Sequence, residues 1–252
     1  MNEPEIHHVL ELVMLGMAVL TFVSVSFLTA PYGRHSRAGY GPTIPPRVGW
    51  VLMESPAVIA FIAIFVSGER RAELAPLALL GLWQIHYVHR TFVFPFRMRP
   101  GGKGMPIGIV LLGMTFNGLN AYLNARWISH FGTYAAEWLV DPRFLAGAAL
   151  FFVGLVINYR ADATLFNLRR PGESGYKIPR GGLYELVSCP NYLGELLEWA
   201  GWALATWSLS GLAFAVYTAA NLAPRAIAHH RWYRRQFPDY PPRRKALIPF
   251  VV

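Results

Sequence analysis

The stretch LLGLWQIHYVHRTFVFPF, residues 79–96, has apolar ends typical of a helix that crosses a membrane. Five polar residues interrupt its middle: Gln84, His86, Tyr87, His89 and Arg90. Ionisable groups at membrane depth are costly unless they are paired or hydrated. The concentration of polar groups in one apolar segment therefore predicts a hydrated cavity between helices.

The composition of the whole chain supports a membrane protein. Of its 252 residues, 54% are apolar and only 15% are charged, and the mean hydropathy is +0.32. A helix needs about 20 residues to cross the hydrocarbon core. We expect an all-α, polytopic membrane protein with one domain over residues 1–252 and seven transmembrane helices, at 8–30, 47–67, 74–96, 107–126, 143–166, 190–207 and 210–228.

The last two of these segments are separated only by Ser208, Leu209 and Ser210. Residues 190–228 could therefore form one long bent or buried segment instead of two spans. Because its length of about 39 residues is nearly twice what a bilayer requires, we favour a helical hairpin.

The distribution of positive charge gives an independent test of seven spans. Seventeen of the 23 Lys and Arg residues lie in four connecting or terminal segments, at 31–47, 97–106, 166–190 and 225–252. Four lie in the segments 68–74 and 126–143. With the N-terminus outside and the C-terminus in the cytoplasm, all four basic segments fall on the cytoplasmic side, as the positive-inside rule predicts.

Several classes of function are disfavoured by the sequence. The net charge of +9 is explained by topology and by contact with anionic lipid, so we expect no nucleic-acid partner. Cys189 is the only cysteine, which excludes a disulfide framework, and we expect no metal site. The start MNEPEIHH lacks a basic signal-peptide region, so the first span is expected to be retained.

Two residues in different spans could act on one ligand oxygen. Tyr87 shares a helix face with Trp83, Gln84, Arg90 and Thr91. Glu54 is the only acid in its own span. An apolar pocket favours the protonated form of a carboxyl group, so Glu54 would share a proton with the Tyr87 hydroxyl. Such a pair could polarise a carbonyl group and stabilise negative charge on its oxygen.

Further polar residues recur at helical spacing in the second half of the chain. They form three stripes, which are Asn158, Asp162 and Arg169; Asn191, Glu195 and Glu198; and Arg225, His229 and Tyr233. Amide, carboxylate and guanidinium groups suit a large polar ligand that carries phosphate. The alternative is that these groups make hydrogen bonds between helices and hold the bundle together.

The two longest polar stretches, 166–190 and 229–249, are both assigned to the cytoplasmic side. We expect them to meet there as loops and to close over the ligand. Neither a GxGxxG nor a Walker motif occurs, so a Rossmann fold is not the means of binding.

Four stretches of this sequence resemble the steroid 5α-reductase family. They are PYGRHSRAGYGP (31–42), HYVHRTF (86–92), LRRPGESGYKIPRGGLYELVSCPNYLGELLEWAGWALATWSLSGLAFA (168–215) and RAIAHHRWYRRQFPDYPPRRKALIPF (225–250). The resemblance implies NADPH-dependent reduction of the C4=C5 double bond of a 3-oxo-4-ene steroid. It also implies that Glu54 and Tyr87 hold the 3-oxo oxygen and that Trp50 lines the steroid cavity.

The resemblance further implies a set of cofactor-binding residues, which are Lys103, Asn158, Asp162, Arg169, Tyr176, Asn191, Glu195, Arg225, His229, Tyr233 and Arg244. The partners expected are steroid, NADPH and membrane lipid. We expect a multi-pass protein of a bacterial inner membrane with its cofactor site facing the cytoplasm. Met53 and Pro190 depart from the pattern of the family.

Three other functions are compatible with parts of this pattern. An isoprenylcysteine-type membrane methyltransferase that uses S-adenosylmethionine has a similar C-terminal region, but it needs no pair that stabilises an oxyanion. A sterol double-bond reductase would differ mainly in the alkene presented. A transporter or channel would use the intramembrane charges as a path for solute, but we find no inverted repeat.

Overall fold

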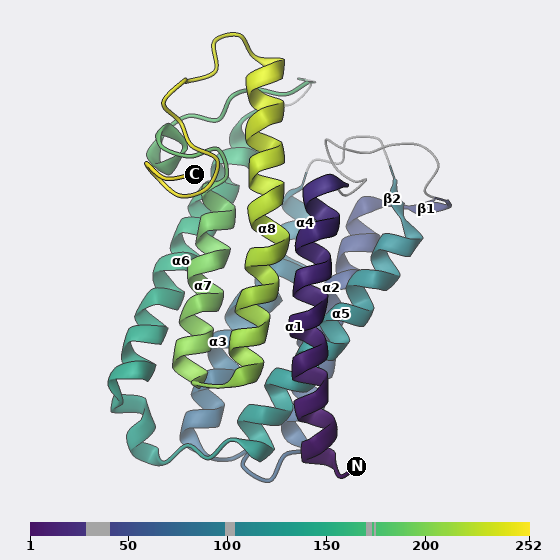
Figure 1. Cartoon of the computed structure of the whole chain (residues 1–252), viewed down its shortest axis with the longest axis vertical. Coiled ribbons are helices and arrows are strands. Elements are labelled where there is room, and N and C mark those ends of the chain that lie inside the picture. Colours follow the sequence, from purple (N-terminus) through teal and green to yellow (C-terminus); the bar gives the residue numbers. More distant parts are fainter. Residues whose placement is uncertain (29–40, 99–103, 170–172, 174) are drawn as a thin grey trace.

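The computed structural model describes residues 1–28, 41–98, 104–169, 173 and 175–252. These residues form a bundle of long upright helices (Figure 1). The helices are α1 (Glu3–Phe27), α2 (Pro46–Val66), α3 (Leu74–Phe92), α4 (Phe94–Arg97), α5 (Ile107–Arg126), α6 (Pro142–Asn167), α7 (Pro190–Thr206) and α8 (Leu209–Gln236). Three short turns, η2 (Trp127–Phe131), η3 (Ala136–Val140) and η4 (Gly182–Glu185), and two strands, β1 (Thr43–Ile44) and β2 (Met105–Pro106), complete the described structure.

Each of the seven segments expected to span a membrane is a helix in the structure. Within the described residues, α1, α2 and α6 are long and apolar enough to cross a membrane, which makes this a membrane protein. The full count of seven spans and the orientation of the termini stay predictions. The expected hairpin at 190–228 is present, because the chain reverses at Trp207, which adopts left-handed backbone angles (φ 45°, ψ 45°).

Some boundaries differ from the expected ones for local reasons. Helix α1 begins at Glu3 because Asn2 caps it and exchanges hydrogen bonds with Glu5 in a capping box. Helix α3 ends at Phe92, and Pro95 lies in the separate short helix α4.

The expectation that 229–249 is a loop is wrong for its first part. Helix α8 continues to Gln236, although residues 229–236 are rich in polar side chains. No proline or glycine occurs in this stretch before Pro238, so nothing in it stops the helix.

The two ends of the bundle are built differently. The last turns of α8, the C-terminal segment and the β1–β2 pair lie at the upper end in Figure 1, while the N-terminus and the 127–141 region lie at the lower end. Strands β1 and β2 pair antiparallel, with Thr43 opposite Pro106. The described parts of the four basic segments therefore gather at one end.

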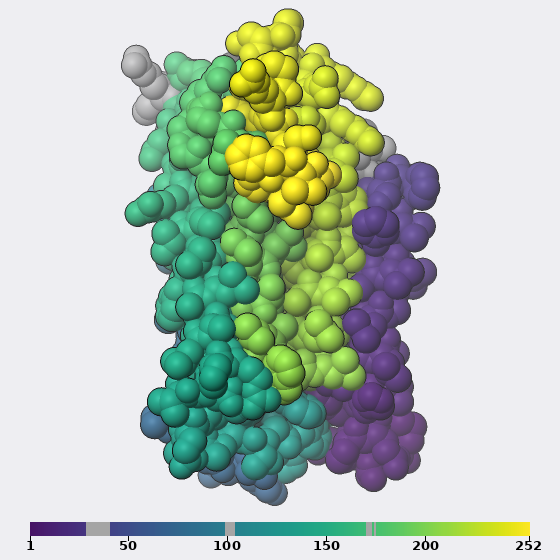
Figure 2. Space-filling view, turned by 60° about the vertical axis from the view of Figure 1, so that its left-hand side comes forward, coloured from purple at the N-terminus to yellow at the C-terminus, as the bar shows by residue number. Residues whose placement is uncertain are grey.

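The polar segments before α7 and after α8 meet at this upper end, as expected. Val187 and Lys245 form a parallel bridge, and the backbone amide of Cys189 donates to the carbonyl oxygen of Ala246 at 3.1 Å. Figure 2 shows the C-terminal segment lying on the upper part of the bundle, against α7 and α8. The end of the chain thus fixes the segment from which α7 begins.

Candidate active site

A buried cluster of charged and amide groups joins α3, α6 and α7. The guanidinium of Arg90 lies 3.8 Å from Oδ2 of Asp162 and 3.5 Å from Oε1 of Glu195. Asn158 donates to Glu195 at 3.3 Å and to the backbone carbonyl of Asn191 at 3.1 Å, and the Asn191 side chain donates to Oδ1 of Asp162 at 3.2 Å. We call these five residues the Arg90 cluster. It brings together four residues that the sequence assigned to cofactor binding.

Helix geometry explains why these four side chains meet. Asn158 and Asp162 are four residues apart on α6, and Asn191 and Glu195 are four residues apart on α7, so each pair lies on one face of its helix. Between the helices stands Gly194, where a side chain would collide with the backbone of Asn158. The absence of a side chain lets the two backbones approach closely enough for direct hydrogen bonds.

Polar atoms around α3 are left without hydrogen-bond partners. His86 pairs with Glu198 through Nδ1 and Oε1 at 2.9 Å, and both residues are buried. Glu198 Oε2, Asp162 Oδ2, Gln84 Oε1 and Thr91 Oγ1 are buried, and none accepts or donates a hydrogen bond within the described chain. Buried polar atoms are normally satisfied, so their concentration here indicates a place for a polar ligand.

Tyr87 and Glu54 lie on the neighbouring helices α3 and α2. Tyr87 is 5% exposed, and its hydroxyl makes no hydrogen bond to another described residue. Glu54 is half-buried and accepts a hydrogen bond from Asn117 at 3.2 Å. The carboxylate lies within electrostatic reach of the phenol, but no hydrogen bond joins the two side chains within the described residues. Their convergence on one ligand oxygen therefore stays a prediction.

Aromatic rings hold this part of α3 in place. The ring of Tyr87 packs against both Trp83 and Trp199, at centroid distances of 4.8 and 5.5 Å. Trp50 donates to the backbone carbonyl of Arg90 at 3.2 Å, and the Arg90 guanidinium lies 4.8 Å from the centre of the Trp50 ring. Trp50 thus packs beside the Arg90 cluster, on the helix that carries Glu54.

A cavity of about 150 Å³ lies between α6, α7 and α8. Its lining residues are Leu165, Tyr184, Ser188, Cys189, Asn191, Tyr192, His229 and Tyr233. His229 and the Tyr192 hydroxyl are 3.1 Å apart, and the Arg225 guanidinium lies 5.8 Å from the centre of the Tyr192 ring. Asn191, His229 and Tyr233 therefore share one cavity, and Arg225 lies next to it.

The other expected cofactor residues lie farther out. Arg169 donates to the backbone carbonyl of Gly175 at 3.2 Å, and Tyr176 is 48% exposed with its ring against Trp232. Arg244 is 2% exposed and donates to the carbonyl of Pro179 at 3.2 Å. The structure thus makes Arg244 a link between the two polar segments. Lys103 lies outside the described residues.

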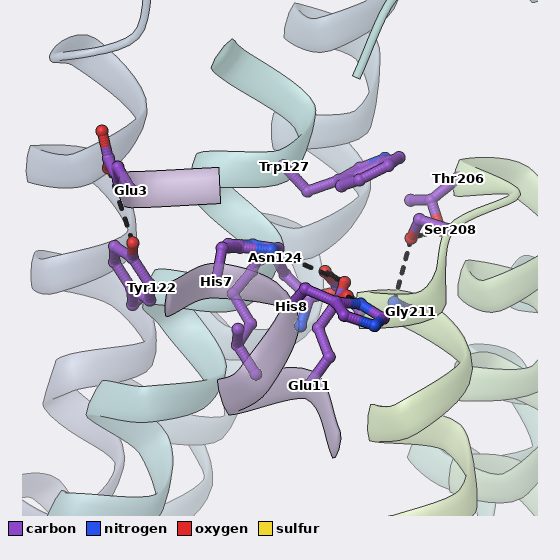
Figure 3. Close-up of polar contacts among 12 residues, drawn as sticks. Glu3, His7, His8, Glu11, Tyr122, Asn124, Trp127, Thr206, Ser208 and Gly211 are labelled. Carbon is purple, nitrogen blue, oxygen red and sulfur yellow. Dashed lines mark hydrogen bonds and ion pairs between the residues drawn. The ribbon is translucent and has the colours of Figure 1, made fainter. Parts of the chain in front are cut away.

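A second polar cluster occupies the opposite end of the bundle, between α1, α5 and α8 (Figure 3). Glu11 accepts from Ser210 at 2.6 Å and lies 3.3 Å from Nδ1 of His8 and 3.7 Å from Nδ1 of His7. His7 Nε2 donates to the carbonyl of Leu123 at 3.0 Å. We call His7, His8, Glu11 and Ser210 the Glu11 cluster. Both carboxylate oxygens of its buried acid have partners.

Comparison with known proteins shows the family to which this chain belongs. Residues 103–252 match the family model described as 3-oxo-5-alpha-steroid 4-dehydrogenase. The protein named steroid 5-alpha-reductase DET2 of Gossypium hirsutum is 46% identical over an alignment of 255 positions, which covers 99% of each chain. This chain belongs to the 3-oxo-5-alpha-steroid 4-dehydrogenase family.

Mammalian members of the 3-oxo-5-alpha-steroid 4-dehydrogenase family are about as similar. The protein named 3-oxo-5-alpha-steroid 4-dehydrogenase 1 of Bos taurus is 45% identical over 241 residues, covering 94% of this chain and 93% of its own. Its namesake in Homo sapiens is 45% identical over 222 residues, covering 87% and 85%. The similarity extends over nearly the whole chain, so it includes the helices that carry Glu54 and Tyr87.

The structure also places in or next to this candidate site several residues that were not among the site residues predicted from the sequence. They are His86, Arg90, Asn117, Tyr192 and Glu198. The polar stripe around Tyr87 already contained Arg90, and the stripe after Pro190 contained Glu198. Asn117 and Tyr192 were not predicted, because the spacing of polar residues along one helix does not reveal which neighbouring helix each side chain faces.

Proposed function

We propose that this protein reduces the C4=C5 double bond of 3-oxo-4-ene steroids with NADPH as the reductant. The observation that carries the proposal is the near full-length identity of about 45% to proteins named as steroid 5α-reductases. The Tyr87 hydroxyl, which makes no hydrogen bond to another described residue, and the half-buried Glu54 carboxyl on α2 are the chemical groups that the reaction requires.

In this proposal Tyr87 donates a hydrogen bond to the 3-oxo oxygen, and the Glu54 carboxyl contacts the same atom. When bound, the nicotinamide group supplies hydride to the β-carbon of the enone, which is C5. Negative charge then develops on the oxygen, where preorganised donors in a water-poor site stabilise it most. The α-carbon takes its proton from solvent. The rings of Trp83 and Trp199 exclude water from the face of Tyr87 on which they pack.

The residues of the Arg90 cluster and the adjoining cavity fit a nicotinamide dinucleotide in their chemistry. The Asp162 oxygen that makes no hydrogen bond within the described residues and the amide of Asn191 suit the amide and ribose groups, and Arg169 and Arg225 suit phosphate. The cavity of about 150 Å³ is smaller than the roughly 300–1,000 Å³ of typical ligand sites, so it would hold only part of the molecule. The rest would lie along the segments that precede α7 and follow α8.

We assign the upper end of the bundle to the cytoplasm. The described parts of all four basic segments gather there. With seven spans, the segments 166–190 and 229–249 then close over the cofactor from the side on which NADPH is found. The relatives compared come from plants and mammals, so the bacterial inner membrane stays a prediction.

The comparisons favour reduction over the alternatives. The family match places the chain with steroid dehydrogenases, and neither methyl transfer nor solute transport gains support from it. In an isoprenylcysteine-type methyltransferase, the phenol of Tyr87 would have no role in the reaction.

The test is turnover by the purified full chain in detergent. We expect NADPH consumption with progesterone or testosterone and a product that carries two added hydrogens by mass spectrometry. The matched control is the corresponding 5α-reduced steroid, which has no C4=C5 double bond and should consume no NADPH. Consumption of S-adenosylmethionine by the protein, with no NADPH oxidation for any enone, would overturn the proposal.

A further inference from the structure

Helix α5 carries three buried amides on one face, which are Asn117, Asn120 and Asn124. An amide inside an apolar bundle is costly unless it finds hydrogen-bond partners. Asn124 donates to Asn120 and accepts from Trp202 at 2.8 Å, so these two belong to the lower part of the bundle. Asn117 turns instead toward α2, which carries Glu54.

One atom of Asn117, the side-chain nitrogen Nδ2, makes two hydrogen bonds. It donates to the backbone carbonyl of Met53 at 2.8 Å and to Oε2 of Glu54 at 3.2 Å. A backbone carbonyl can only accept, so the group that faces α2 must be the NH₂ of the amide and not its oxygen. Oε2 of Glu54 is therefore an acceptor. When the carboxyl group is protonated, its proton sits on the other oxygen, Oε1.

The surrounding sequence explains how α5 comes close enough. Gly113 precedes Asn117 by four residues, and a side chain there would collide with Met53. Pro56 follows shortly on α2 and removes one hydrogen bond from the helix, which weakens the backbone beside Glu54. The bond from Asn117 to the Met53 carbonyl ties this weakened turn to the neighbouring helix.

We propose that Asn117 is the positioning residue for Glu54. It fixes the carboxyl plane and reserves Oε1, with its proton, for the oxygen of the substrate. This role rests on the proposed reductase function. It adds to the proposed site a residue that acts only through Glu54. Asn117 makes no hydrogen bond to the Arg90 cluster within the described residues, so cofactor binding should not depend on it.

The first test is a double-mutant cycle on steroid reduction. We expect Asn117→Leu to lower kcat about 10- to 100-fold, because small misplacement of a catalytic group has effects of this size, while KM for the steroid and Kd for NADPH change less than about threefold. In a Glu54→Gln background the same substitution should have no further effect on single-turnover rate. Equal losses in both backgrounds, or no loss in either, would overturn the proposal.

The second test does not require turnover. The carboxyl stretching band of Glu54, identified by its loss in Glu54→Gln, should shift in the infrared spectrum of Asn117→Leu. Asn120→Leu is the matched control, since it removes a buried amide from the same face without touching Glu54, and it should leave both band and kcat unchanged. An unmoved band in Asn117→Leu contradicts the positioning role. Absence of steroid reduction by the wild type, with a shifted band, contradicts the proposed reaction instead.

Discussion

The Arg90 cluster and the Glu11 cluster place ionisable groups inside the same bundle, but they satisfy them differently. At the Glu11 cluster, both oxygens of the buried carboxylate have partners, and His7 also bonds the backbone of α5. Around the Arg90 cluster, one oxygen each of Asp162 and Glu198 lacks a hydrogen-bond partner in the described structure. Arg90 lies 3.5 Å or more from both of its acidic partners.

This difference separates a structural network from a binding site. A closed network stabilises the native state, and nothing remains in it to recognise a ligand. An open network carries the cost of unpaired polar atoms until a ligand supplies the missing bonds. We therefore expect variants at the Glu11 cluster to change stability alone, and variants at the Arg90 cluster to change both stability and cofactor affinity.

The largest effect is expected for Arg90→Met. The substitution leaves Asp162 and Glu195 buried without their cation, which typically costs about 3–5 kcal/mol of unfolding free energy. We expect a strongly lowered Tm in detergent and no detectable stabilisation by NADPH.

Glu11→Gln is the matched comparison for Arg90→Met. It should lower the unfolding free energy by about 1 kcal/mol, because hydrogen bonds are weakened without an unpaired cation being left behind. NADPH should still raise its Tm as much as in the wild type. If NADPH lost its effect in Glu11→Gln, the distinction between the two clusters would fail.

Removal of the groups assigned to the substrate oxygen should come next. Tyr87→Phe and Glu54→Gln should each lower kcat by about 100-fold or more, because each removes a group that acts on the developing oxyanion. NADPH affinity should be retained, as measured by equilibrium binding. Tyr122→Phe, at the lower end of α5, is the control and should keep its turnover. Full turnover in both site variants would exclude them from catalysis.

Substitution of single residues that we propose to bind the cofactor should have intermediate effects. Asn191→Ala and Arg169→Ala should each weaken NADPH binding about tenfold, which corresponds to roughly 1.4 kcal/mol. Isothermal titration gives the Kd directly. Asn124→Ala removes a buried amide elsewhere in the bundle, so it should lower Tm but leave the Kd unchanged. An unaltered Kd in Arg169→Ala would place that residue outside the site.

The smallest effect is expected at a surface position that belongs to neither cluster. Asp141 caps α6 and is held by Arg143, whose side-chain hydrogen bond lowers the pKa of Asp141 to about 2. Because the folded pKa lies below the unfolded value of about 3.9, Asp141 stabilises the fold above pH 4 and loses this contribution between about pH 4 and 2. Asp141→Asn should flatten the Tm profile slightly in that range and not at neutral pH.

Hydropathy and charge predicted much of the fold because both signals are local. Each expected span proved helical, and the hairpin at Trp207 followed from segment length alone. Hydropathy did not predict the extension of α8 to Gln236, because its last turns are polar; these turns pack against the C-terminal segment. One example is the stacking of Tyr233 on Tyr240 at a centroid distance of 5.3 Å.

The site was predictable where its residues repeat along one helix. Asn158 with Asp162 and Asn191 with Glu195 follow helical spacing, so their shared faces were visible in the sequence. The residues that face these pairs from a neighbouring helix could not be predicted, because spacing along one helix does not show which helix packs against it. The bond from Asn117 to Glu54 joins residues that are 63 positions apart, and it depends on how α5 packs against α2.

The bridge between Val187 and Lys245 also bears on how the protein is made. During synthesis α7 is complete before the residues that anchor its first turn have been translated. The segment before Pro190 therefore has no fixed place until α8 has followed and the chain has turned back. The proposed site would therefore be completed late in biogenesis, and we expect a nascent chain stalled within α8 to have a nearly complete bundle that does not retain NADPH.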